Sequence, residues 1–124
     1  MPKTIFHCHG GIQRNYGDMA LVSAMRRQIA SKTEEVLGKS VVFEDVDVKN
    51  PAPITRNTVD MMNKRGDMLL IGGGGMVMKG DGFQTRSGWQ LNISLSDLKA
   101  LKIPIVVYGI GYNAFEGEHK GFDT

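Results

Sequence analysis

The sequence contains a single cysteine, Cys8, among its 124 residues, which excludes an intramolecular disulfide bond. A lone cysteine is typical of a reducing compartment, and we expect a cytoplasmic protein. No apolar run approaches the roughly 18 residues of a membrane-spanning helix, and the apolar part of the N-terminal segment is too short for a signal peptide. We therefore expect no membrane span.

The chain also has little excess charge of either sign. Lys and Arg total 15, Asp and Glu total 13, and the net charge is +2. No basic run is longer than two residues. Proteins that bind nucleic acid through its phosphates need a basic face or stripe, so we expect no nucleic-acid partner.

The residues that are abundant are glycine, with 16 copies, and methionine, with 8. The glycines gather in a few loops between short apolar runs and segments of helical periodicity. Bounded apolar runs rich in β-branched residues predict strands, and apolar residues spaced by three to four predict helices. On these patterns we expect strands at residues 4–9, 40–48, 67–72 and 103–111, a long loop at 72–88, and helices at 18–38, 56–66 and 87–102.

The alternation of strands and helices predicts the fold class. We expect an α/β fold, a Rossmann-like three-layer domain with a mostly parallel sheet of about four strands, since crossover helices connect parallel strands. The domain is expected to span residues 1–115, followed by a polar tail at 116–124. Asp18 is expected to cap the first helix, and either Ser87 or Ser96 to cap the third.

Glycine-bearing loops follow the first, third and fourth predicted strands. A parallel sheet places these loops at the edge formed by the carboxyl ends of its strands, where α/β proteins bind ligands. Bare backbone N–H groups and a helix N-terminus can bind a phosphate or carboxylate, so we expect a small anionic or sugar substrate. The predicted substrate-binding residues are Asn15, Gly17, Asp18, Gly72, Gly73, Gly74, Gly75, Lys79, Arg86, Gly109, Gly111, Tyr112 and Asn113.

Four consecutive glycines, Gly72 to Gly75, have a large entropic cost on folding and need an explanation. The segment does not match the phosphate loop G-x-x-x-x-G-K-[ST], because no lysine follows Gly80. The first loop does not match the dinucleotide fingerprint G-x-G-x-x-G. Two interpretations stay open: close packing of the backbone where a strand crosses into a loop, or the approach of a ligand to bare backbone.

Several residues near this edge also allow two interpretations. His7 and His9 share one face of the first predicted strand and Cys8 lies on the other. We therefore favour a buried cysteine with a satisfied histidine over a metal site, and expect neither a metal nor an activated cysteine. A histidine at the end of this strand can still contact substrate. Lys79 and Arg86 either bind an anionic substrate or are solvated loop cations.

Trp89 and Asp18 are ambiguous in the same way. Trp89 either covers a sugar ring or packs against the third helix, and we favour packing. Asp18 either caps its helix or contacts a ligand. It is the one acidic residue at this edge that we name as a candidate catalyst.

Three segments, in this order, resemble the N-terminal half of the polysaccharide pyruvyl transferase family: "NYGDMALVSAM", "DMLLIGGGGMVMKGD" and "SGWQLNISLSDLKALKIPIVVYGIGYNAF". The resemblance covers about residues 5–115. It implies transfer of the pyruvyl group of phosphoenolpyruvate to sugar hydroxyls of a cell-surface or exported polysaccharide, with no cofactor. It also implies a fold similar to one half of a glycosyltransferase B-type enzyme. Its site-lining residues would be Asn15, Gly17, Asp18, Gly72 to Gly75 and Gly109 to Asn113.

Members of that family usually run to several hundred residues, and the resemblance implies that phosphoenolpyruvate binding and acid catalysis lie largely in a second half. We therefore expect this chain to line one wall of a cleft and to be incomplete alone. Two alternatives stay open: a non-catalytic module that binds a sugar phosphate or a nucleotide, or a subunit that pairs with a separate C-terminal half. An exposed edge at the fourth strand would pair in a homodimer or with that half.

Overall fold

The computed structural model of the chain describes residues 1–9, 16–46, 54–78 and 91–113. None of the helices in these ranges combines the length and the apolar character that crossing a lipid bilayer requires. The elements, in chain order, are β1 (Lys3–Cys8), α1 (Tyr16–Leu37), β2 (Val41–Val46), α2 (Arg56–Arg65), β3 (Met68–Ile71), β4 (Gly74–Met78), α3 (Leu95–Lys99), β5 (Ile105–Val107) and β6 (Ile110–Asn113).

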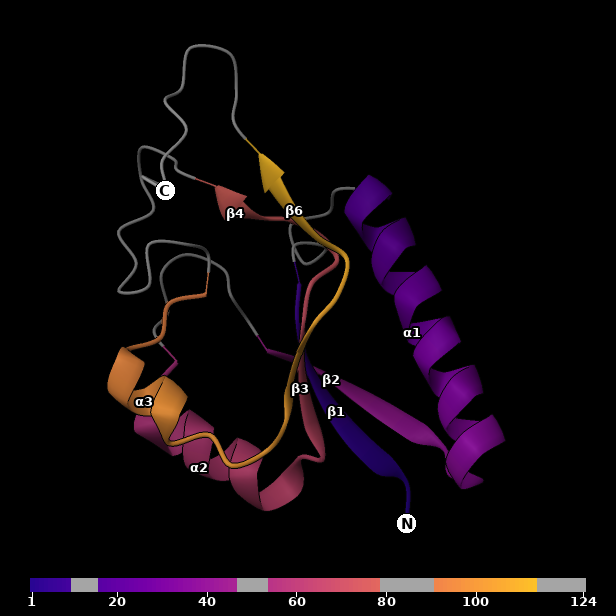
Figure 1. The fold of residues 1–124 in the computed structure, drawn as a ribbon, viewed down its shortest axis with the longest axis horizontal. Helices are drawn as coiled ribbons and strands as arrows, with labels where there is room; N and C mark the ends of the chain where they lie inside the picture. Colours follow the sequence, from indigo (N-terminus) through magenta and orange to yellow (C-terminus); the bar gives the residue numbers. More distant parts are fainter. Residues whose placement is uncertain (10–15, 47–53, 79–90, 114–124) are drawn as a thin grey trace.

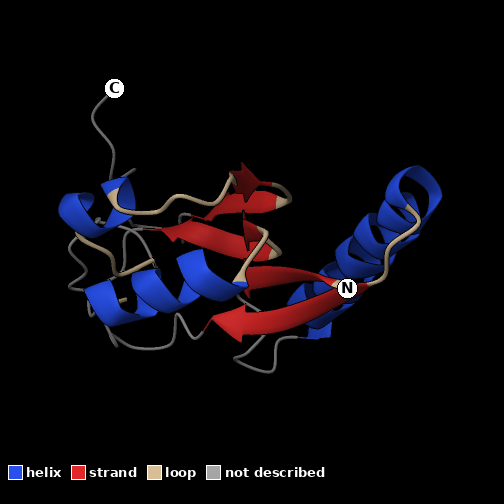
Figure 2. Cartoon of the chain, turned by 90° about the horizontal axis from the view of Figure 1, so that it is seen from below, coloured by secondary structure: helices blue, strands red, loops and turns tan. Residues whose placement is uncertain are grey.

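Four strands form one parallel sheet in the order β2-β1-β3-β5. Helix α1 lies on one face of this sheet, and α2 and α3 lie on the other (Figure 1, Figure 2). This arrangement confirms the predicted α/β three-layer fold with a parallel sheet of four strands. At the carboxyl edge, Cys8 of β1 is paired with Val46 of β2 and with Ile71 of β3. The ends of these three strands are therefore level.

Strand β1 sends alternate side chains into the two layers, as the period of a strand requires. Phe6 and Cys8 belong to the larger apolar cluster, with Met62 of α2, whereas Ile5 packs with Met25 of α1. Cys8 is fully buried, and burial raises the pKa of its thiol to about 12. The thiolate is the nucleophilic form, and burial disfavours it, which agrees with the prediction that Cys8 is not activated.

Helix α1 begins at Tyr16, so the prediction that Asp18 caps it is wrong. Asp18 lies in the first turn instead, where a carboxylate is stabilised by the positive end of the helix dipole. The predicted end of the helix is confirmed, because Gly38 follows the last helical residue with a φ of +64°. Its N–H donates to the carbonyl of Glu34 at 2.9 Å, a common way to end a helix.

The second helix matches its prediction and the third does not. Helix α2 follows Thr55, whose side chain accepts a hydrogen bond from the N–H of Thr58, and it ends before Gly66. Helix α3 is much shorter than the predicted segment 87–102. Its N-cap is Ser94, so the predicted caps Ser87 and Ser96 are both wrong.

The error in α3 has a local cause. The Ser94 hydroxyl accepts a hydrogen bond from the N–H of Asp97 at 3.1 Å, and this cap starts the helix late. Upstream, Leu91 and Ile93 are buried, and Ile93 forms an isolated parallel bridge with Ile54. Apolar side chains that we attributed to a helical face therefore lie partly on an extended segment.

The segment that follows β3 is also not the single loop that was predicted over residues 72–88, because β4 begins at Gly74. The predicted fourth strand is divided into β5 and β6, and β6 pairs in parallel with β4. The register is retained across the interruption, since Ile71 pairs with Val107 and Gly74 pairs with Ile110. We call the interruption the glycine break, and it comprises Gly72 and Gly73 on one strand and Tyr108 and Gly109 on the other.

Candidate functional site

The carboxyl ends of β1, β3 and β5 meet at the glycine break. The N–H of Gly72 donates to the carbonyl of Cys8 at 3.0 Å, and the N–H of Tyr108 donates to the carbonyl of Ile71 at 2.9 Å. The first turn of α1 lies against the same edge, because Asp18 reaches Gly74. The structure thus brings together the starts of the three loops that the sequence placed at one edge. Asn15, Lys79 and Arg86 lie outside the described residues.

At each of the first three glycines of the run, a different neighbouring group leaves no room for a side chain. A Cβ on Gly72 would lie 1.6 Å from the carbonyl oxygen of Tyr108. A Cβ on Gly73 would lie 2.6 Å from Cγ2 of Val22, and one on Gly74 would lie 2.7 Å from Cγ of Asp18. The φ angles of the three glycines are +148°, +102° and +128°, which residues with a side chain rarely adopt. Close packing of the backbone therefore accounts for these three glycines.

The amides of the same three glycines are used inside the fold. Gly72 donates to Cys8 as described above, and the N–H groups of Gly73 and Gly74 both donate to the carbonyl of Gly109, at 3.0 and 3.3 Å. An anion cradle needs N–H groups that point at the ligand. The approach of a ligand to this run stays a prediction, and it would depend on neighbouring groups rather than on these three amides.

Within the described part of the chain, Asp18 is an acidic side chain that lies beside the glycine run at Gly74. It is partly buried, and both carboxylate oxygens would lie within 2.9 Å of a Cβ on Gly74. Gly17, beside it in the chain, is exposed. A carboxylate that lies on bare backbone at the start of a helix has a fixed place at the edge, and from there it can accept a hydrogen bond from a substrate hydroxyl.

A polar cluster of four side chains lies between α1 and the sheet, directly beside the break. It consists of His7, His9, Arg26 and Asp45. The Nε2 of His7 lies 2.8 Å from the carbonyl oxygen of Gly72, and the Nε of Arg26 donates to Nδ1 of His7 at 3.1 Å. Asp45 accepts from a terminal nitrogen of Arg26 and lies 2.7 Å from Nε2 of His9. The cluster runs from exposed Asp45 to fully buried His7.

Burial, hydrogen bonds and neighbouring charge together determine which side chains of this cluster are charged. Desolvation lowers the pKa of His7 to about 4, although the hydrogen bond to Gly72 opposes the shift, so His7 is neutral at pH 7. Desolvation would raise the pKa of Asp45, but hydrogen bonds from His9 and Arg26 and the charge of Arg26 outweigh it and lower that pKa. Asp45 is therefore ionised, and Nε2 of His9 is its donor. The 3.4 Å separation between Arg26 and that nitrogen then joins two donors and is not a hydrogen bond.

Sequence reasoning found half of this cluster. It placed His7 and His9 on one face, which the structure confirms, since their ring centroids are 4.6 Å apart. It did not find Arg26 or Asp45. The available signal was the parallel pairing of the first two strands, which places Asp45 beside His7. Within the described ranges, no three His, Cys, Asp or Glu side chains are arranged to hold a metal ion.

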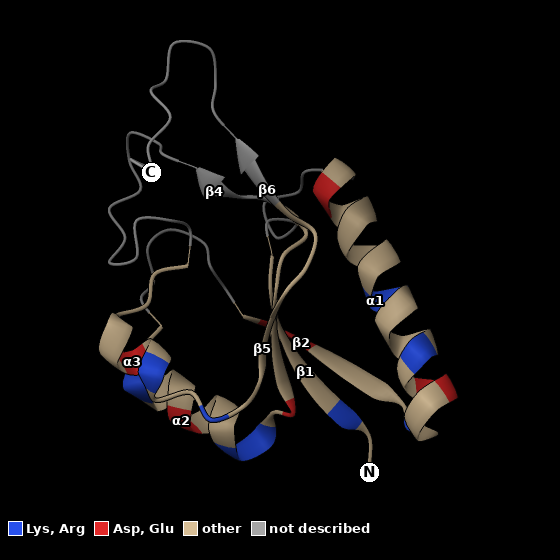
Figure 3. Ribbon diagram, viewed as in Figure 1, with Lys and Arg blue, Asp and Glu red and all other residues tan. Residues whose placement is uncertain are grey.

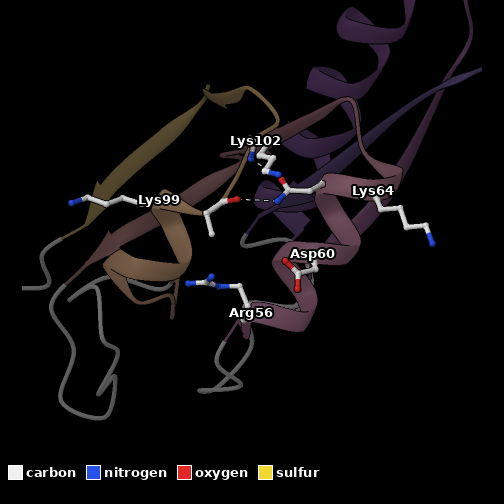
Figure 4. A pocket seen from close by; sticks show the side chains of 7 residues that line it. Arg56, Asp60, Lys64, Lys99 and Lys102 are labelled. Carbon is white, nitrogen blue, oxygen red and sulfur yellow. Dashed lines mark hydrogen bonds between the residues drawn. The ribbon is translucent and has the colours of Figure 1, made fainter.

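A separate pocket of about 560 Å³ lies between α2 and α3, on the opposite face of the sheet from α1 (Figure 4). In Figure 4, Lys64 and Lys99 extend away from each other. Arg56 is ion-paired with Asp97 at 2.8 Å. Figure 3 shows acidic and basic residues interspersed on these two helices. The cations do not converge, so we assign no ligand to this pocket. Its lining residues are Arg56, Asp60, Asn63, Lys64, Lys99, Ala100 and Lys102.

Comparison with known proteins bears on the family of the chain. The family model of polysaccharide pyruvyl transferase matches residues 15–122, a range that includes Asp18 and the glycine break. Neither the curated proteins nor the solved structures gave a significant match. The family match spans most of the sequence and agrees with the three segments that resemble this family. The chain therefore belongs to the polysaccharide pyruvyl transferase family.

Proposed function

We propose that this chain forms one wall of a site where pyruvate is transferred from phosphoenolpyruvate to a sugar of a cell-surface polysaccharide. Membership of the family is the observation that carries the proposal. The location of Asp18 and the glycine break supports it, because α/β folds bind substrates beyond the carboxyl ends of their strands.

The reaction sets the chemical demands on the site. An acid protonates the methylene carbon of phosphoenolpyruvate, and a sugar hydroxyl adds to the carbon that carries the carboxylate. A second hydroxyl then displaces inorganic phosphate, which leaves with its bridging oxygen and yields a cyclic ketal. The site must supply a proton donor, an acceptor for the hydroxyl protons and cations that stabilise the departing phosphate.

Asp18 is our candidate for the acidic residue of this wall. Asp18 lies in the first turn of α1, and a carboxylate oxygen accepts hydrogen bonds, so we propose that Asp18 accepts one from an attacking sugar hydroxyl. Lys79 and Arg86 are proposed to contact the phosphate, although both lie outside the described residues. We propose no cofactor and no metal for this transfer.

The opposite wall is proposed to come from a second domain or subunit, through the edge of β5. Ile105, Val106 and Val107 are 42, 38 and 55 % exposed, which supports a partner at this edge. A second copy of the chain and a C-terminal half are the two candidates.

The test is phosphate release from phosphoenolpyruvate in the presence of a galactoside or mannosamine acceptor. We expect Asp18→Asn to lower the rate by at least about 100-fold, the lower end of the effect of removing a general acid or base. Asp60→Asn on α2, on the other face of the sheet, is the matched control and should retain the rate.

Three results would change the proposal. Equal rates for the wild type and Asp18→Asn would remove Asp18 from the reaction. Binding of phosphoenolpyruvate or a sugar phosphate without phosphate release would favour the non-catalytic module. The absence of both binding and release in an assembly that supplies both walls, either the dimer or the complex with a C-terminal half, would contradict the proposed function.

A further inference from the structure

His7 is a fully buried side chain whose two ring nitrogens both face groups of fixed hydrogen-bonding polarity. On one side lies the carbonyl oxygen of Gly72, at 2.8 Å, which can only accept. On the other side lies the Nε–H of Arg26, at 3.1 Å, which can only donate. The ring must therefore carry its proton on Nε2 and keep a lone pair on Nδ1. Any other state places two donors or two acceptors face to face.

The Gly72–Gly73 peptide is held at both ends by this arrangement. Its carbonyl accepts from His7, and its N–H donates to the carbonyl of Gly109 at 3.0 Å. Glycines have no Cβ to restrict φ, so a peptide between two glycines can rotate at low steric cost. A rotated peptide would point its N–H at His7 and its carbonyl at the carbonyl of Gly109. Only a ring with a lone pair on Nε2 would accept that N–H.

Arg26 is itself fixed in place. Asp45 accepts a hydrogen bond from its guanidinium, and the guanidinium carbon lies 5.0 Å from the centroid of the Phe43 ring. Both of these residues are on β2, so the orientation of Arg26 is set by the sheet rather than by α1 alone. Within the described residues, the charged groups facing His7 are thus Arg26 from α1 and Asp45 from β2, with His9 directly after the end of β1.

We infer that Arg26, by fixing the tautomer of His7, sets the orientation of the Gly72–Gly73 peptide and so the shape of the glycine break. His7 and Arg26 are positioning residues in this account, since they act through the peptide that precedes Gly74. The inference does not depend on pyruvyl transfer. Its bearing on catalysis rests on the proposed function, through the contact between Gly74 and Asp18.

The first experiment measures the tautomer directly. In protein with ¹⁵N-labelled histidine, long-range ¹H–¹⁵N correlation at pH 7 distinguishes a protonated Nε2 from a protonated Nδ1. We expect His7 of the wild type to carry its proton on Nε2 alone. A His7 that is protonated on Nδ1, or on both nitrogens, would overturn the inference.

The second experiment compares two neighbouring arginines. Arg26→Met removes the donor to Nδ1 and keeps an apolar stem, and we expect a population of His7 protonated on Nδ1 to appear. We also expect the Gly73 amide to exchange with solvent about three- to tenfold faster, as for the loss of one net hydrogen bond. Arg27→Met, at the next and exposed position of α1, should change neither quantity. An unchanged tautomer and unchanged exchange in folded Arg26→Met would contradict the inference.

A pair of substitutions at His7 gives an independent check. The side-chain amide of glutamine reaches the position of Nε2, whereas that of asparagine reaches only the position of Nδ1. His7→Gln should therefore keep the Gly73 amide within about threefold of the wild-type exchange rate, and His7→Asn should not. Equal protection in both variants would show that the bond to Gly72 does not hold the peptide. If phosphoenolpyruvate binds neither the wild type nor any variant in an assembly that supplies both walls, the proposed function fails, whereas the tautomer and exchange measurements still decide the inference.

Discussion

The carboxylate of Asp18 occupies the space that a side chain at Gly74 would need. A Cβ at position 74 would lie 2.7 Å from Cγ of Asp18, closer than two carbon atoms approach without a bond. The first turn of α1 therefore rests on bare backbone of β4. The space beside Gly74 is thus filled by a side chain of the protein itself.

This contact predicts an interaction energy between the two positions. Gly74→Ala should destabilise the protein by about 2–4 kcal/mol, through backbone strain at a φ of +128° and through the overlap with Asp18. In an Asp18→Ala background the overlap is removed, and the cost of Gly74→Ala should fall by about 1 kcal/mol or more. Urea unfolding of the four proteins in this cycle measures the difference. The same cost in both backgrounds would contradict the contact.

Gly72 should tolerate a side chain less well than any glycine that is free of close neighbours. A Cβ there would lie 1.6 Å from the carbonyl oxygen of Tyr108, and neither backbone can withdraw without breaking the sheet. We expect Gly72→Ala to lower the free energy of unfolding by more than about 4 kcal/mol, or to prevent folding altogether.

Gly38 provides the matched control for that substitution. It also has a positive φ, +64°, but no atom lies within 4 Å of its Cβ position. Gly38→Ala should cost about 1–2 kcal/mol, from backbone strain alone. Far-ultraviolet circular dichroism and urea unfolding separate the two cases, and similar losses at both positions would contradict the steric explanation.

The stability of the protein should depend on pH through His7. Its pKa is about 4 in the folded chain and 6.5 in an unfolded one, so the unfolded state binds more protons between these values. The contribution of neutral His7 to stability is complete above pH 6.5 and is lost as the pH falls towards 4. The size of the loss is about 3–4 kcal/mol, from roughly 1.4 kcal/mol per unit of pKa.

His7→Gln removes the titrating group and should flatten the free energy of unfolding across this window. Asp45 and Asp67 also have lowered pKa values, but their contribution is lost nearer pH 3.8 and below. Urea unfolding at intervals from pH 7 to pH 4 measures the profile. A slope in His7→Gln equal to that of the wild type would assign the effect to other groups.

The exposed edge of β5 predicts self-association or capture of a partner half. If a second copy covers this edge, light scattering should report a dimer, and Val106→Lys should convert it to a monomer because a charged edge resists strand pairing. Val42→Lys on β2, at the opposite edge of the sheet, is the control and should leave the dimer intact. A wild-type protein that stays monomeric at high concentration would exclude the homodimer, and a C-terminal half would remain as the candidate partner.

The four strands of the main sheet and the three-layer arrangement could be predicted from the sequence because they follow from local patterns. Runs such as Met68–Ile71 have the continuous apolar character of a buried parallel strand, and the glycines and prolines between elements mark their ends. Helix α2 was predictable for the same reason, since Thr55 caps it and Gly66 ends it. The loops at the carboxyl edge followed from the topology rather than from any one residue.

The features that could not be predicted depend on contacts between distant segments. Nothing in the glycine run shows that β4 continues the ladder, because its pairing with β6 is set by the bend of two strands together. Arg26 lies in a helix that also carries the cations Arg27 and Lys32, and Asp45 follows another acid, Glu44, on its strand, so neither stands out locally. Their role appears only when α1 packs on the sheet and a buried histidine needs partners of the correct polarity.

The glycine break gives the domain a corner without loss of pairing. Both strands bend at the same level, and the same partners continue beyond the bend, so β4 and β6 leave the direction of the main sheet as a joined pair (Figure 1). The main sheet and the β4–β6 pair meet at the glycine break, and α1 packs against the break on one side through Val22 and Asp18. Because β4 and β6 leave the break as a hydrogen-bonded pair, a displacement of one strand at the break would move the other strand with it.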